Sequence, residues 1–416
     1  MRTSTPIILI VGKPFSGLSS YLLAHNFEYI VLKDARLQKA NSKNLKRRTF
    51  CSFSNREKML ATVDALAQKH HIAAVMTVYE QYVLATAEIA NHLKLPGLPI
   101  EAARACTDKY VMRQKFAHAP KKISPDYAVV ESETDVRTFV DAHAFPLILK
   151  PANLSKSLLV TKSESYDELI QNYDRTVTNL GATYAKYAPN TIPKLLIEEF
   201  MEGPAHSVDA FVDNQGQEHV LNAVVDYQTG YDIGYDDNFH YSRLLPSTLS
   251  SKDIAEIIEV AKLGCKALGM KNSPAHIEII LTSDGPRIVE IGARNGGYRE
   301  RMHRLSNQLD VTDNALRLAL GEQPTILLPT NYPVGVFELF PKAPGIFTGL
   351  AHEAELQRLP SLVYYSLKVI PGEFVGKSSD GFKMCAIVIL HHTDSEQFKR
   401  DHTFLDQHVY VQTQPA

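Results

Sequence analysis

The sequence predicts a mixed α/β and α+β protein: an N-terminal open parallel sheet, then α+β structure, then a small C-terminal β-rich unit. Two observations support this prediction. Over about the first 100 residues, short apolar runs alternate with helical patterns, which is typical of a parallel sheet with crossover helices. Further along, two apolar runs flank an Asp-Gly turn at residues 284–285, which indicates an antiparallel hairpin.

The N-terminal pattern starts with a continuous apolar run at residues 6–11, as expected for a strand that is buried on both faces. A glycine-containing turn at residues 12–17 follows it. This turn does not match a P-loop, because Leu18 follows its second glycine where a lysine is required. We therefore interpret it as a structural turn. The other strands expected here cover residues 29–32 and 73–78, and the helices cover residues 18–25, 56–70 and 82–93.

Beyond residue 100 we expect helices and strands in a less regular order. The expected helices cover residues 102–118, 251–268 and 311–320, and the expected strands cover residues 145–151, 195–201, 207–212 and 220–227. Prolines at positions 329 and 333 mark a boundary. A β run at residues 383–390 belongs to the last unit.

Composition excludes several classes of protein. The chain has 416 residues, of which 22% are charged, and a formal net charge of -2. This balance is that of an ordinary globular protein and excludes a general nucleic-acid or membrane-surface binder. No apolar run is long enough to span a membrane, so we expect a cytoplasmic protein. The four widely spaced cysteines fit neither a zinc site nor a disulfide framework, and we expect reduced core thiols.

The hairpin carries the most informative residues of the chain. If it folds about Asp284, Glu278 and Glu290 face each other on one side of the sheet. Two opposed carboxylates repel each other, unless a divalent cation lies between them. Magnesium prefers one or two carboxylates together with substrate phosphates. Arg294 would place a fixed positive charge beside such a metal. Taken alone, the motif leaves open a surface hairpin whose acids are merely solvated.

Further residues fall in an order that resembles the ATP-grasp superfamily. The resemblance rests on Lys109 in a helix, Lys150 at a strand end, Glu198-Glu199-Phe200-Met201 before a turn, Glu278, and Glu290-x-x-x-Arg294. Members of that superfamily bind ATP between two α+β subdomains and join a carboxylate to a nucleophile. Residues 108–113, the Glu290–Arg294 pattern and the extra C-terminal unit most resemble the L-amino-acid ligases, which form dipeptides. The resemblance implies a Rossmann-like pre-ATP-grasp domain at residues 1–103, an ATP-grasp domain at 104–328 and a C-terminal α+β unit at 329–416.

The resemblance also implies a nucleotide site. Lys109 and Lys150 would contact the ATP phosphates, as compact point charges. Residues 198–201 would form the adenine hinge, with Glu198 or Glu199 accepting from the adenine amine and Phe200 and Met201 continuing the hinge. His206 and Asp209 would lie near the ribose. At the position of His206 the family often has glutamate. Ser155 and Ser157 would donate to phosphate from a loop in which Leu158 and Leu159 replace the expected glycines.

The implied chemistry is ATP-dependent formation of a C–N bond through an acyl phosphate, with release of ADP and phosphate. Glu278 and Glu290 would bind Mg²⁺ or Mn²⁺, Arg294 would stabilise the oxyanion and the transferring phosphoryl group, and His240 would line the acceptor site. The partners implied are a small carboxylate and an amine, both amino acids, with no nucleic acid and no membrane. A homodimer remains open. Two alternatives also remain: an ATP-dependent carboxylase and a non-catalytic nucleotide-binding protein.

Overall fold

The N-terminal region is the predicted open parallel sheet. The computed structural model describes residues 5–14, 17–37, 47–154, 158–188 and 191–415. Four parallel strands lie in the order β3-β2-β1-β4. Their bounds are β1 Ile7–Val11, β2 Glu28–Asp34, β3 Arg48–Cys51 and β4 Ile72–Met76, and the helices are α1 Leu18–Ala24, α2 Arg56–Lys69 and α3 Val83–His92. Sequence analysis missed β3, which is short and only partly apolar.

The single helix expected at residues 102–118 is in fact two helices, α4 (Ile100–Thr107) and α5 (Lys109–Phe116). Asp108 separates them, because its backbone is extended, with φ of -132° and ψ of 108°. Its carboxylate accepts hydrogen bonds from the backbone N–H groups of Tyr110 and Val111 and so caps α5. The break redirects the chain, so that Lys109 begins a new helix rather than lying in the middle of one.

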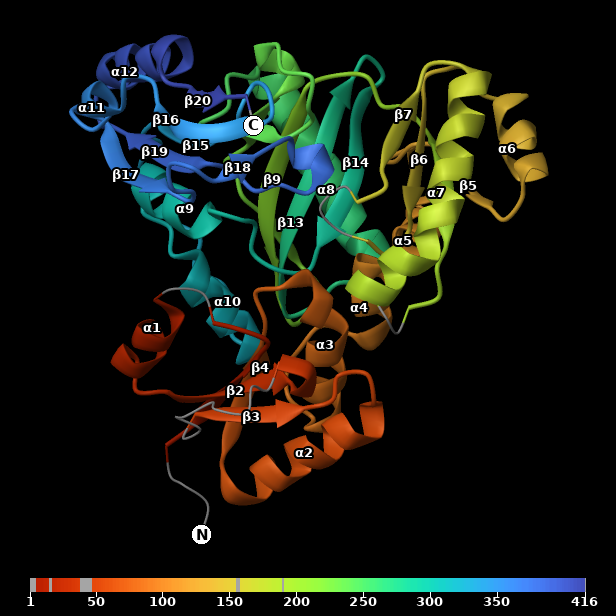
Figure 1. Cartoon of the computed structure of the whole chain (residues 1–416). Coiled ribbons are helices and arrows are strands. Elements are labelled where there is room, and N and C mark those ends of the chain that lie inside the picture. The colour runs from red at the N-terminus through yellow and green to blue at the C-terminus, as the bar shows by residue number, and fades with distance from the viewer. Residues whose placement is uncertain (1–4, 15–16, 38–46, 155–157, 189–190, 416) are drawn as a thin grey trace.

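A small antiparallel sheet forms one lobe of the next region, at the right of Figure 1. Its strands lie in the order β5-β8-β6-β7. Their bounds are β5 Tyr127–Val130, β6 Leu147–Pro151, β7 Thr161–Ser163 and β8 Leu195–Glu199, and the helices α6 (Glu133–Val140) and α7 (Tyr166–Tyr187) pack on the lobe. One face of the sheet packs on these helices, and the opposite face carries Lys150 and Glu198.

A nine-stranded sheet forms the centre of the molecule. Eight strands follow the order β14-β13-β9-β11-β12-β15-β19-β17, and β10 pairs with β9. Their bounds are β9 Ala205–Val212, β10 Glu218–Val220, β11 Val225–Thr229, β12 His240–Leu245, β13 Ser273–Thr282, β14 Gly285–Gly292, β15 Val334–Leu339, β17 Leu362–Leu367 and β19 Ala386–His391. The prediction of one continuous strand at residues 220–227 was wrong, because β10 ends at Val220 and β11 begins at Val225.

Three helices connect this sheet to the rest of the molecule. They are α8 (Ser251–Leu268), α9 (Arg299–Asn307) and α10 (Val311–Ala319). Apolar residues of α10 pack against β1 and β4 of the N-terminal sheet, so this helix joins the two regions (Figure 1). The last residues add the small sheet β18-β16-β20 and the helices α11 and α12. Their bounds are β16 Gly345–Leu350, α11 Glu353–Leu356, β18 Phe374–Val375, α12 Ser395–His408 and β20 Val411–Gln414.

The hairpin of β13 and β14 confirms the opposition of Glu278 and Glu290, which are direct partners in the register. The turn itself differs from the expectation. Thr282 pairs with Gly285, so only two residues form the turn, and a bulge beside Glu278 restores the register. The bulge is required, because a simple two-residue hairpin would have paired Glu278 with Val289.

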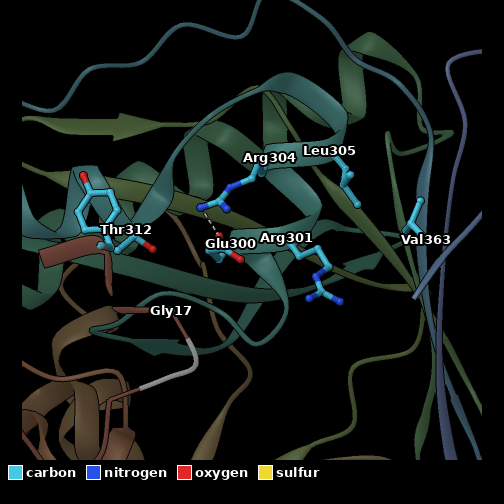
Figure 2. A pocket seen from close by; sticks show the side chains of 8 residues that line it. Gly17, Glu300, Arg301, Arg304, Leu305, Thr312 and Val363 are labelled. Atoms are coloured by element: carbon cyan, nitrogen blue, oxygen red, sulfur yellow. Dashed lines mark ion pairs between the residues drawn. The ribbon is translucent and has the colours of Figure 1, made fainter. Parts of the chain in front are cut away.

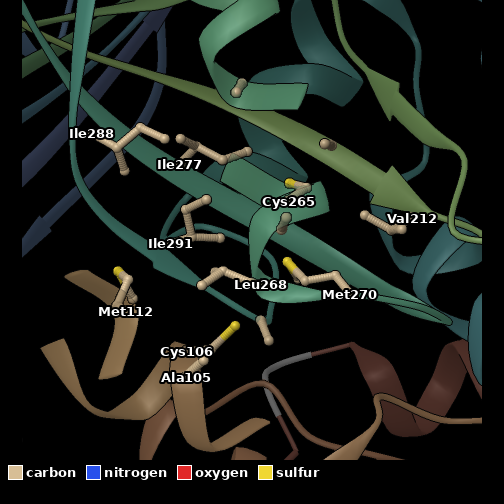
Figure 3. Packing of buried hydrophobic residues seen from close by; sticks show 14 of the residues in the cluster. Ala105, Cys106, Met112, Val212, Cys265, Leu268, Met270, Ile277, Ile288 and Ile291 are labelled. Atoms are coloured by element: carbon tan, nitrogen blue, oxygen red, sulfur yellow. The ribbon is translucent and has the colours of Figure 1, made fainter. Parts of the chain in front are cut away.

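Apolar packing beneath the hairpin fixes its position. Ile277, Ile288 and Ile291 meet α8 and α5 in one buried cluster, seen in Figure 3. Gly264 of α8 allows close packing there, because a Cβ on it would lie 2.5 Å from Ile288 Cδ1 and would force that side chain to shift. All four cysteines are free and buried, as expected. Among the described residues, no helix is both long and apolar enough to cross a membrane.

Candidate functional site

Strand alternation gathers the candidate residues on one face of the large sheet. Glu290 of β14, Glu278 of β13 and Ser207 of β9 are consecutive register partners. Cross-strand partners share a face, and residues two apart along a strand do as well. Asp209 and Tyr227 therefore lie on the same face as the two glutamates, and α9 packs against it.

The glutamate pair lies beside a half-buried lysine. Lys109 Nζ is 2.8 Å from Glu290 Oε2 and 3.3 Å from the Leu154 carbonyl oxygen. Burial alone would lower the pKa of Lys109, but the carboxylates of Glu290 and Glu80 raise it overall. The lysine is thus held charged at the edge of the carboxylate pair, which is where a phosphate would approach a metal bound there.

A network of ion pairs connects Glu278 to buried charged side chains of β9, β13 and α9. His276 Nε2 lies 3.7 Å from Glu278 Oε1, and its Nδ1 lies 2.8 Å from Asp209 Oδ1. Burial disfavours the charge on His276, yet these two carboxylates raise its pKa to about 9. Burial likewise opposes ionisation of Glu278, but His276 outweighs it and lowers the Glu278 pKa to about 2. Asp209 also contacts Arg299 and His303 of α9, each at 3.2 Å.

Arg294 joins the N-terminal region to the hairpin. Its Nε lies 2.9 Å from Glu80 Oε2, and its Nη1 donates to the Asn295 carbonyl oxygen at 3.1 Å. Glu80 follows β4, at the carboxyl edge of the parallel sheet, and packs so closely on Gly292 that a Cβ there would lie 2.8 Å from Glu80 Oε2. Sequence analysis missed Glu80. Its signal was an acidic residue just beyond the end of a parallel strand, where open sheets bind ligands.

The Glu80 carboxylate is buried without a hydrogen-bond donor. Both of its oxygens lack a donor among the described residues, in spite of the short distance to Arg294. Burial raises the pKa of Glu80, and Glu290 adds to this, whereas Arg294 and Lys109 oppose it. A buried carboxylate that has only one ion-pair partner keeps free acceptor positions, which a ligand with N–H donors can fill.

A second ion-pair network lies under the small lobe. Glu198 accepts from Arg113 Nε at 3.0 Å and from Arg113 Nη2 at 3.2 Å, and its Oε2 lies 2.6 Å from Lys150 Nζ. All three side chains are buried. Burial lowers the pKa of Lys150 to about 8, although Glu198 partly offsets this. Lys150 is therefore paired with a hinge residue, and its contact with ATP phosphates stays a prediction.

The hinge residues divide between two sides of the lobe. Glu199 points outward, where its carboxylate accepts from Lys122 at 3.0 Å and from the Asp126 backbone N–H at 3.2 Å. Glu198 is held by Arg113 and Lys150. Because both carboxylates have partners, the backbone at residues 199–201 is the better candidate for reading an adenine edge. Lys162 Nζ lies 4.3 Å from the centroid of the Phe200 ring, so a cation packs on this hinge residue. Met201 is the next residue of the chain.

His206 does not lie where the resemblance implied. It pairs in register with Ile279 and Asp226, so its side chain is on the face opposite Glu278. Its Nδ1 contacts Asp226 Oδ1 at 2.9 Å. The predicted contact of His206 with the ribose is therefore wrong, because strand alternation places this side chain on the other face. Its neighbours Ala205 and Ser207 lie on the site face. Ser155 and Ser157 lie outside the described residues.

His240 lies on the site face, at the far side from Lys109. Its ring contacts Tyr227 at 4.7 Å between centroids. Burial lowers its pKa, and Arg243 adds to this, while Glu278 and Glu338 oppose it. A mainly neutral imidazole within electrostatic reach of Glu278 fits the predicted place beside an acceptor, where a neutral nitrogen can accept a proton.

The two carboxylates fit a magnesium ion. Among the described residues, no group of three or more His, Cys, Asp or Glu side chains could hold a metal. Glu278 and Glu290 are nevertheless a directly opposed pair of oxygen donors, and magnesium commonly takes one or two carboxylates plus substrate phosphates. The pair would hold the ion against the phosphates that Lys109 faces.

Two family models match the chain. An ATP-grasp domain matches residues 143–301, and an ATP-grasp N-terminal domain matches residues 29–97. The chain belongs to the ATP-grasp superfamily. The matched ranges include Lys150, Glu198, the hairpin glutamates and Arg294.

Known proteins support the same assignment. The L-amino acid ligase from Bacillus licheniformis superimposes with a TM-score of 0.78 at 18% identity, covering 99% of this chain and 100% of that chain, and this likeness shows the fold. The alanine–anticapsin ligase of Bacillus subtilis is 25% identical over 251 residues, which are 58% of this chain and 52% of the relative. Human carnosine synthase 1 is 23% identical over 326 residues, 71% of this chain and 37% of the relative. The chain thus spans about half or less of these curated relatives.

Proposed function

We propose that this protein is an ATP-dependent carboxylate–amine ligase that joins amino acids. One observation carries the proposal: Glu278, Glu290 and Lys109 lie together, and the Arg294–Glu80 pair lies close to them. The first group suits ATP, and the second suits a substrate that bears both a carboxylate and an ammonium. The names of the relatives, an L-amino acid ligase and an alanine–anticapsin ligase, point to the same substrate class.

The proposed reaction has two steps. The carboxylate of the first substrate attacks the γ-phosphorus of ATP and releases ADP, which leaves an acyl phosphate. The amine of the second substrate then attacks the acyl carbon, a proton leaves the nitrogen, and inorganic phosphate departs. The divalent ions would neutralise the β- and γ-phosphates. Arg294 would donate to the oxygen that carries the developing charge, and His240 is placed to take the amine proton.

Glu80 is proposed to bind the ammonium of the first substrate. Its two buried oxygens have no hydrogen-bond donor among the described residues, and an ammonium supplies three. Arg294 lies 2.9 Å away and would then bind the carboxylate of the same molecule. The N-terminal region would thereby complete a site whose other parts belong to the large sheet.

The decisive experiment measures phosphate release from ATP with pairs drawn from the common amino acids. We expect ADP and phosphate to form only when two substrates are present, together with a dipeptide detected by mass spectrometry. Matched α-hydroxy acids, which lack the ammonium, should fail as first substrates. Glu80→Gln should raise the KM of the first amino acid by about 10-fold or more, because a charge-assisted bond is lost. Formation of AMP and pyrophosphate, or no stimulation by any pair, would refute the proposal.

A further inference from the structure

A cavity lies on the outer side of α9, away from the face that carries the glutamates. Its volume is about 460 Å³, within the range of about 300–1,000 Å³ that is common for small-molecule pockets. Figure 2 shows Arg301, Arg304 and Leu305 on α9, with Gly17 and Thr312 on other segments of its wall. Tyr21 and Val363 also line it. Segments from three distant parts of the sequence thus build one pocket.

The cavity presents one cation that no carboxylate neutralises. Arg301 lies over the Tyr364 ring at 4.5 Å and has no ion-pair partner among the described residues. The ring covers one face of the guanidinium and leaves its N–H edge to bind a ligand. Arg304 differs, because it pairs with Glu300 and lies 3.7 Å from Asp310. The net charge that the cavity offers a ligand therefore comes from Arg301.

Thr312 supplies a second, independent sign of a ligand. The residue is 3% exposed, and its hydroxyl is buried without a hydrogen-bond partner in the described part of the chain. A buried hydroxyl of this kind is costly unless something outside the fold pairs with it. Its backbone N–H, in contrast, is satisfied by Asp310 at 2.9 Å. Thr312 lines the same cavity as Arg301.

Glu300 also lines the cavity, paired with Arg304, and the remaining lining is largely apolar. Leu305 is half-buried and Val363 is 45% exposed, and the Tyr21 ring adds an aromatic surface. Apolar groups that line a cavity gain free energy when a ligand removes them from water. We propose that this cavity binds a small carboxylate with an apolar body, whose carboxylate meets Arg301 and Thr312 and whose body covers Leu305 and Val363.

This site is separate from the proposed catalytic centre. Arg299 and His303 face the large sheet, where they contact Asp209. Arg301 and Leu305, on the same helix, face the cavity instead. One helix thus presents one side to the network beneath Glu278 and the other side to the bound carboxylate, so the two sites are distinguishable by mutation.

Calorimetry with 4-methylpentanoate tests the proposal, and the neutral 4-methylpentanamide serves as the matched ligand control. We expect saturable binding of the acid at millimolar concentration, at least about 10-fold weaker binding of the amide, and a similar loss for the acid in Arg301→Gln. Thr312→Val should weaken binding about 3- to 10-fold. Arg400→Gln, on exposed α12, removes the same charge elsewhere and should have no effect. Thermal unfolding would verify that each variant is folded.

Three outcomes would overturn the proposal. The first is no saturable binding of the acid to the intact protein. The second is equal binding to the Arg301→Gln variant. The third is binding that is lost in Arg294→Lys but kept in Arg301→Gln, which would place the carboxylate at the catalytic centre. Because phosphate release is not measured, these outcomes do not depend on the proposed ligase activity.

Discussion

Replacing Arg294 by lysine should damage turnover far more than ATP binding. In the structure two of the three guanidinium nitrogens have partners. Its Nε faces Glu80 at 2.9 Å, its Nη1 donates to the Asn295 carbonyl oxygen at 3.1 Å, and Nη2 has no acceptor among the described residues. Nη2 is thus the donor left for a reacting oxygen. A lysine has one ammonium, which Glu80 would attract, and so it cannot keep the same geometry.

The size of the effect follows from this count of donors. Loss of one preorganised donor to a developing oxyanion costs about 100- to 1,000-fold in kcat, or about 2.7–4 kcal/mol. ATP affinity should change by less than about 3-fold, because Lys109, Lys150 and the hinge are untouched. Calorimetry gives the affinity, and phosphate release with a productive substrate pair gives kcat. Arg287→Lys, at the turn end of β14, is the matched control and should leave both unchanged, because Arg294 lies just beyond the opposite end of that strand.

Two results would refute this reasoning. If ATP affinity falls in parallel with kcat, Arg294 binds the nucleotide in its ground state. If neither changes, the residue only bridges the N-terminal region to the hairpin.

Three further predictions follow from the charged groups. Glu278→Gln and Glu290→Gln should each lower turnover by about 100-fold or more and raise the magnesium concentration needed for half-maximal rate, measured by phosphate release; unchanged magnesium dependence would remove the hairpin from the metal site. ATP affinity should fall about 10-fold per pH unit as pH rises above about 8, where Lys150 loses its proton, and Lys150→Arg should abolish this dependence in calorimetry. Glu198→Gln should lower the free energy of unfolding in urea by about 3–5 kcal/mol, because buried cations lose their partner, whereas the exposed Glu199→Gln should cost at most about 1 kcal/mol.

Local patterns predicted those parts of the site that depend on strand geometry. The opposition of Glu278 and Glu290 follows from their spacing about the turn, and the structure confirms it although the turn is one position away and a bulge compensates. The same alternation could have excluded His206, since a residue three positions before Asp209 lies on the other face of β9. Lys109 lies beside Glu290 and Lys150 beside Glu198, and the contact of both lysines with ATP phosphates stays a prediction.

Contacts between segments that are far apart in the chain could not be predicted from the sequence. Glu80 and Arg294 are 214 residues apart, and only the packing of the N-terminal sheet against the hairpin brings them together. The pairing of Arg113 with Glu198 has the same origin, because it depends on where α5 lies under the small lobe. The break at Asp108 depends on a single capping side chain within a pattern that reads as continuous helix. The division into three domains at residues 103 and 328 stays a prediction.

The continuity of the large sheet limits how the C-terminal segment can be removed or exchanged. Strand β15 is hydrogen-bonded to β12 on one side and to β19 on the other, so residues after 333 share one sheet with the β13–β14 hairpin. Cutting the chain at residue 328 would leave β12 as a bare edge and would remove Glu338, which holds Tyr298 and Arg243. The C-terminal segment is therefore no interchangeable module: exchanging it for that of another protein would require a graft that restores the β12 ladder and an acid at position 338.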